Sequence, residues 1–128
     1  MRTIIIDTNS ILRFLLDDIP EQNAEVQKLF QQAKKTNLEI IVSEIVIFEI
    51  HFILEKYYLF RKEEIIEKLG IIVSSNYLNI ESREIFTSAL KLYRENNISL
   101  VDCFLLVKAE IEEAELFTFD DKMKMVKI

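Results

Sequence analysis

The stretch TIIIDTN at residues 3–9 decides how this chain is expected to fold. Its β-branched run over residues 3–6 has the composition of a buried strand, and Asp7 follows directly at the carboxyl end of that strand. Similar short apolar runs recur along the chain. They predict a second strand at 39–42, a third at 77–80, a fourth at 116–118 and a fifth at 125–128.

Helical patterns fill the segments between these runs. They cover residues 9–16, 20–35, 43–58, 63–69, 82–95 and 99–114, while 71–73 fits either a helix extension or a strand. Alternating strands and helices predict an α/β fold with a mostly parallel sheet covered on both faces. No repeat, low-complexity tract or linker interrupts the chain, so we expect one domain over residues 1–128.

The charge and glycine content exclude several classes of function. Sixteen basic and 22 acidic residues give a net charge of −6, the wrong sign for a protein that coats nucleic acid through bulk electrostatics. With one glycine in the chain, no glycine-rich phosphate loop or dinucleotide fingerprint is present. An enzyme whose acids gather around bound cations is compatible with this balance.

Cysteine content and hydropathy indicate the compartment. Cys103 is the single cysteine, so no intrachain disulfide forms, and this suits a reducing cytoplasm. No apolar run reaches the length of a membrane span, and residues 1–7 lack the features of a signal peptide. We therefore expect a cytoplasmic protein with no membrane partner.

Four carboxylates stand in apolar surroundings. Asp7 follows the first predicted strand and Asp120 follows the fourth, so the two acids lie side by side if those strands are neighbours. Glu49 and Asp102 fall inside two helices that are apolar nearly all round, which predicts that both helices are buried or nearly so.

A buried carboxylate is unfavourable by several kcal/mol unless a cation or hydrogen bonds compensate it. No Lys or Arg lies at helical contact spacing from Glu49 or Asp102. Mg²⁺ and Mn²⁺ prefer oxygen ligands, so a cluster of Asp7, Glu49, Asp102 and Asp120 suits either ion. Such a site activates water and stabilises charge on a phosphodiester oxygen.

Each acid also fits an ordinary structural role. Asp7 can cap the helix that follows it, and Ser99 with Asp102 matches a capping box. Glu49 can be an exposed helix residue whose apolar neighbours face a partner. Asp120 can be a turn residue, and the adjacent Asp121 competes with it for any role as a ligand.

Four segments that contain these acids resemble the motifs of PIN-domain nucleases, in the same order and spacing across nearly the whole chain. The segments are IDTNSIL at 6–12, EIVIFEI at 44–50, ISLVDC at 98–103 and LFTFDD at 116–121. The length is similar to that of VapC-type toxins, the ribonuclease members of toxin–antitoxin pairs.

The resemblance implies a three-layer α/β/α sandwich with a mostly parallel five-stranded sheet. It implies Mg²⁺- or Mn²⁺-dependent cleavage of RNA to a 5′-phosphate and a 3′-hydroxyl, a homodimer, and an antitoxin that blocks the active site. The residues that would bind metal and catalyse are Asp7, Glu49, Asp102 and Asp120. The residues that would support the site are Thr8, Asn9, Ser99, Thr118 and Asp121, the last as an alternative fourth ligand.

Three other residues could take part in the site, and the sequence favours only one of them. Arg13 follows Asp7 on the same short helix, which would let it reach the mouth of the site, whereas His51 and Cys103 are expected to be structural. Four basic residues could contact phosphate or simply face solvent, and six aromatic residues could contact a partner or pack in the core. The basic candidates for phosphate contact are Arg61, Lys62, Lys122 and Lys124, and the aromatic candidates for a partner contact are Phe14, Phe48, Phe52, Tyr57, Tyr58 and Phe60.

Three competing functions remain open from the sequence. A receiver-like signalling module needs a phosphoacceptor Asp at the end of its middle strand, and residues 39–43 offer none. A catalytically silent scaffold that binds metal or a partner would keep the same fold. A nuclease of this fold acting on DNA or on ribosomal RNA precursors, outside any toxin–antitoxin pair, would keep the same acids.

Overall fold

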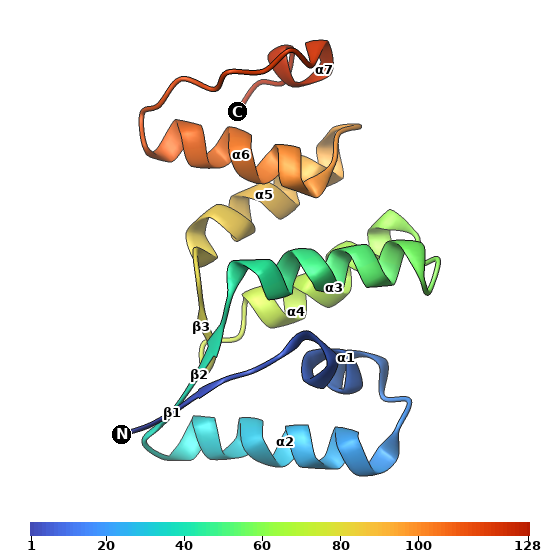
Figure 1. Cartoon of the computed structure of the whole chain (residues 1–128), viewed down its shortest axis with the longest axis vertical. Coiled ribbons are helices and arrows are strands. Elements are labelled where there is room, and N and C mark those ends of the chain that lie inside the picture. The colour runs from blue at the N-terminus through green and yellow to red at the C-terminus, as the bar shows by residue number, and fades with distance from the viewer. The chain divides into compact units, whose positions relative to one another are not determined.

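The computed structural model describes all residues, 1–128. The chain forms two compact units, Met1–Glu81 and Ser82–Ile128. Figure 1 labels the elements of each unit along the chain. The first unit alternates strands with helices, and the second is helical. None of the helices is long and apolar enough to cross a membrane.

A three-stranded parallel sheet organises the first unit. It consists of β1 (Arg2–Ile5), β2 (Leu38–Val42) and β3 (Asn79–Ile80), in the order β1-β2-β3. Ile5 pairs with Ile41, and Val42 pairs with Ile80, so the carboxyl ends of the strands meet at one edge of the sheet. The predicted α/β class with a parallel sheet is confirmed.

Two helices connect β1 to β2, and two connect β2 to β3. They are α1 (Thr8–Leu16), α2 (Pro20–Lys35), α3 (Glu44–Lys56) and α4 (Lys62–Val73). The proline at the first position of α2 begins that helix as expected, since its missing N–H would have no partner there. The ambiguous run 71–73 belongs entirely to α4, and Ile72 and Val73 continue its buried face.

Apolar side chains from the sheet and from α1, α3 and α4 form the core of the first unit. Ile40, Ile50 and Leu69 are fully buried. The aromatic rings of Phe14 and Phe30 pack edge to face, with their centroids 4.9 Å apart, and this contact joins α1 to α2. The edge of the sheet that carries Asp7 is therefore held by well-packed elements.

The second unit contains α5 (Arg83–Glu95), α6 (Leu100–Ile111) and α7 (Asp121–Lys124). The strongly amphipathic α5 presents its apolar face to α6, as the spacing predicted. Phe86 and Phe104 meet between these two helices with ring centroids 4.9 Å apart, and Cys103 is fully buried as expected.

Five strands were predicted and three are present. Residues 114–120 form no regular secondary structure, and Phe117 and Phe119 are exposed. Residues 125–128 are irregular and follow the short helix α7. An alternating apolar pattern defines which side chains share a face, but a strand also requires a neighbouring backbone to pair with. The pattern therefore predicted too many strands.

Candidate functional site

Asp7 follows β1 after one intervening residue, Ile6, where the chain turns into α1. It is the N-cap of α1, and its Oδ1 accepts a hydrogen bond from the Ser10 backbone N–H at 2.9 Å. Hydrogen bonds from the Ser10 side chain and backbone hold the pKa of Asp7 below its ordinary value of 3.8, and slight burial only partly opposes them. Asp7 therefore caps α1, and the hydrogen bonds of the cap favour the ionised form of its carboxylate.

Thr8 links Asp7 to the acid on α3. Its buried hydroxyl donates a hydrogen bond to Oε1 of Glu49, 41 positions away in the sequence. A cavity of about 310 Å³ lies at this point, lined by Asp7, Thr8, Asn9, Leu12, Glu49 and Ile53. The structure thus brings together two of the four predicted acids and two of the predicted supporting residues.

The expectation that Glu49 is buried is wrong. Glu49 is exposed, and its helical neighbours Ile45 and Phe52 are 76% and 59% exposed. The opposite face of α3 supplies Ile47 and Ile50 to the core. A helix that is apolar all round still packs only one face against its own unit, so hydrophobicity alone does not bury every side chain on it.

Asp102 occupies the first turn of α6. Its backbone N–H donates to the Ser99 hydroxyl oxygen at 3.1 Å, so Ser99 is the N-cap that the sequence predicted. Asp102 is half-buried, and Val101 and Leu105 beside it are 49% and 41% exposed. Its carboxylate is accordingly more accessible than the apolar sequence suggested.

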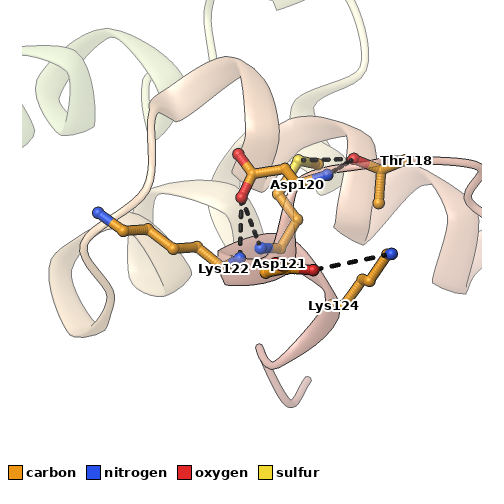
Figure 2. Close-up of polar contacts among 6 residues, drawn as sticks. Thr118, Asp120, Asp121, Lys122 and Lys124 are labelled. Atoms are coloured by element: carbon orange, nitrogen blue, oxygen red, sulfur yellow. Dashed lines mark hydrogen bonds and ion pairs between the residues drawn. The ribbon is translucent and has the colours of Figure 1, made fainter.

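Asp120 caps the short helix α7 (Figure 2). Its Oδ1 accepts from the backbone N–H groups of Lys122, at 2.8 Å, and Met123, at 3.4 Å. Its own N–H donates to Thr118 Oγ1 at 3.0 Å. Thr118 therefore supports Asp120 through the backbone.

Asp121 has a different environment from its neighbour. Its carboxylate lies 3.8 Å from the Lys124 ammonium in an exposed pair, and its side chain is 95% exposed (Figure 2). The two backbone N–H groups at the start of α7 donate to Asp120 instead. Locally, Asp120 is thus the more firmly oriented of the two carboxylates.

The predicted acids are divided between the two units. Asp7 and Glu49 share a cavity in the first, while Asp102 and Asp120 belong to the second. Neither unit alone gathers three His, Cys, Asp or Glu side chains that could hold a metal ion.

Arg13 does not take part in the Asp7 cavity, contrary to expectation. It is buried, and its guanidinium lies 3.3 Å from the carboxylate of Asp18. The Asn23 side chain donates to the Arg13 backbone oxygen at 2.9 Å and fixes this corner between α1 and α2. The residue is therefore structural in this unit.

Glu25 is a neighbour of the site that the sequence did not single out. It lies on α2 and lines, with Asp7, Ser10 and apolar residues of β1 and α2, a second cavity of about 450 Å³. Its position in an ordinary amphipathic helix gave no signal, because only the packing of α2 beside β1 places it near Asp7.

Comparison with known proteins agrees with the motif order. The family model of the PIN domain matches residues 4–128, and the chain belongs to this family. Among curated relatives, the VapC ribonuclease of Aquifex aeolicus (strain VF5) is 28% identical over 106 residues, which are 83% of this chain and 78% of that protein. The resemblance inferred from the four motifs is confirmed.

Proposed function

We propose that this chain is a divalent-metal-dependent endoribonuclease and the toxin of a toxin–antitoxin pair, acting in the cytoplasm. Membership of the PIN domain family and similarity to a VapC ribonuclease support the assignment. The observation that carries it is the cavity at the end of β1, where Asp7 and Glu49 meet around Thr8.

The donor set fits a hard divalent cation. Asp7 carries a carboxylate that is ionised at neutral pH, and its hydrogen bonds from Ser10 lower its pKa further; Glu49 opens on the same cavity. Carboxylate oxygens are the ligands that Mg²⁺ and Mn²⁺ prefer. We propose that Asp7, Glu49, Asp102 and Asp120 hold the ion, which when bound would supply an activated water and stabilise charge on the scissile phosphate.

The surrounding residues orient these carboxylates. Ser10 fixes one oxygen of Asp7, and Thr8 holds one oxygen of Glu49, leaving each carboxylate a second oxygen. The side chain of Asn9 lines the same cavity. We propose Asp120 rather than Asp121 as the fourth acid, since two backbone N–H groups orient it.

The remaining parts of the proposal concern assembly. We propose that residues 1–128 act as one nuclease domain on an RNA substrate, and that the chain forms a homodimer. An antitoxin protein would block the acidic site. The exposed apolar residues of α3 and α6, among them Ile45, Phe52 and Val101, are compatible with such contacts.

A cleavage assay on single-stranded RNA tests the proposal. With Mn²⁺ present, wild type is expected to produce 5′-phosphate ends, and Asp7→Asn or Asp102→Asn to lower the rate by about a hundredfold or more. Glu67→Gln removes the same charge from an exposed site on α4 and serves as the control. Cleavage that persists in Asp7→Asn, or that is equally lost in the control, contradicts the assignment.

A further inference from the structure

The loop between α3 and α4 exposes a group of aromatic side chains that the proposed catalytic site does not use. We call residues 57–60, Tyr-Tyr-Leu-Phe, the aromatic loop. Tyr57 is 82% exposed, Leu59 78% and Tyr58 40%. Large apolar side chains this exposed at a loop tip are unusual for packing residues and indicate a binding surface.

The backbone holds this loop in a strained but well-bonded turn. Leu59 has a φ of 56°, in the left-handed region, where a side chain other than glycine is unfavourable by about 1 kcal/mol. The turn is fixed on both sides, because Tyr58 N–H donates to the Ile53 oxygen and Phe60 N–H donates to the Leu54 oxygen. The exposed rings therefore extend from a fixed frame.

The rings follow one another at distances suited to stacking. The centroids of Tyr57 and Tyr58 lie 6.2 Å apart and those of Tyr58 and Phe60 lie 6.0 Å apart. The ammonium of Lys68 lies 5.5 Å from the centroid of the Phe60 ring. Tilted rings at this spacing leave the outermost face, on Tyr57, available to a further planar group.

Cations accompany the rings although the whole chain is acidic. The segment KYYLFRK at 56–62 contains three basic residues and no acid, in a chain of net charge −6. Lys56 and Arg61 lie 3.6 Å from Glu55 and Glu64 in exposed pairs. Exposed ion pairs of this kind contribute little to stability, so a phosphate group can replace the carboxylate with little loss of free energy.

The aromatic loop follows the end of α3, one turn beyond Ile53 of the cavity at Asp7. Ile53 forms part of the wall of that cavity beside Glu49, and its backbone oxygen accepts hydrogen bonds from both Tyr57 and Tyr58. Eight residues separate Glu49 from Tyr57, which corresponds to about 12 Å along the helix axis. A strand of RNA lying on the cavity would reach the loop within a few nucleotides.

We propose that the aromatic loop binds single-stranded RNA, with Tyr57 stacking on a base and Lys56 and Arg61 contacting the adjoining phosphates. This inference rests on the proposed ribonuclease function and adds a substrate-binding site outside the acids. Aromatic rings interleaved with cations are the arrangement by which proteins hold single strands, whose bases are free to stack. Duplex RNA, whose bases are already stacked, would gain nothing from Tyr57.

Fluorescence anisotropy of a labelled single-stranded RNA of about ten nucleotides, measured in EDTA to prevent cleavage, tests the site. Tyr57→Ala should weaken binding by about tenfold, the effect of losing one base stack. Tyr57→Phe keeps the ring and should bind like wild type. Ile71→Ala removes a 46% exposed apolar side chain from α4 of the same unit and should change nothing.

The outcomes separate this inference from the proposed function. If wild type cleaves RNA and Tyr57→Ala binds single strands as tightly as Tyr57→Phe, the loop proposal is wrong and the nuclease assignment stands. If wild type does not cleave but Tyr57→Ala still loses single-strand binding, the loop proposal stands alone. A Tyr57→Ala variant that changes only self-association, measured by sedimentation, identifies a protein interface and overturns the RNA site.

Discussion

At the scale of single residues, Asp7 combines a structural role with the chemical role that we propose for it. It caps α1 through Ser10, and its carboxylate opens on the cavity that Glu49 shares. The two roles are compatible, because one carboxylate has two oxygens. A cap that uses one of them orients the other.

Substitutions at Asp7 should separate the two roles. Asparagine is as good an N-cap as aspartate, so Asp7→Asn should keep the stability of the metal-free protein while abolishing cleavage. Asp7→Ala should abolish cleavage and also lower the free energy of unfolding by about 1 kcal/mol. Urea unfolding in EDTA measures this difference. Equal stability of the two variants would show that the Ser10 contact contributes nothing.

Thr8 and Glu49 show which features of single residues could be predicted from the sequence and which could not. Glu49 was a candidate because its helical neighbours are apolar, and Thr8 because its segment resembles a PIN-domain motif. Their hydrogen bond joins two segments 41 positions apart, and no local pattern encodes such a contact. The sequence left both a buried and an exposed Glu49 open, because the outcome depends on which face of α3 the unit covers.

At the scale of elements, features with strong local signals were predicted well. The start of α2 at Pro20 and the cap of α6 at Ser99 were both predicted, because proline geometry and a side-chain cap act within a few residues. The strands at 116–118 and 125–128 failed for the opposite reason. Strand formation requires a partner backbone, and a run of three or four residues does not specify one.

The end of α6 provides a prediction about stability. Glu113 has a φ of 53°, and the bonds from Glu113 N–H to Glu110 and from Ala114 N–H to Ala109 form the left-handed helix ending that normally contains glycine. Glu113→Gly should therefore raise the free energy of unfolding by about 1 kcal/mol. Thermal or urea unfolding measures it.

The same substitution inside the helix gives a matched control. Glu110 is exposed within α6, so Glu110→Gly should lower the free energy of unfolding by about 1 kcal/mol. Opposite signs for two glycines three positions apart would identify backbone conformation as the cause. Two losses of similar size would show that the left-handed turn at Glu113 is not populated in solution.

At the scale of the whole molecule, the central proposal is that Asp7, Glu49, Asp102 and Asp120 hold one metal ion. Family membership over residues 4–128 supports it, as does the order of the four motifs. A net charge of −6 is consistent with a protein whose acids are compensated by bound cations. The claim requires that losing an acid from either unit removes metal binding.

A Mn²⁺ titration of thermal stability tests this most directly, with wild type beside Asp7→Asn, Asp102→Asn and the control Glu67→Gln. A metal that binds only the folded chain should stabilise wild type and the control by roughly 2.7 kcal/mol at a hundredfold excess over its dissociation constant. We predict that both Asn variants lose this stabilisation. A full response in Asp102→Asn with loss only in Asp7→Asn, or no response in wild type, would contradict a shared metal site.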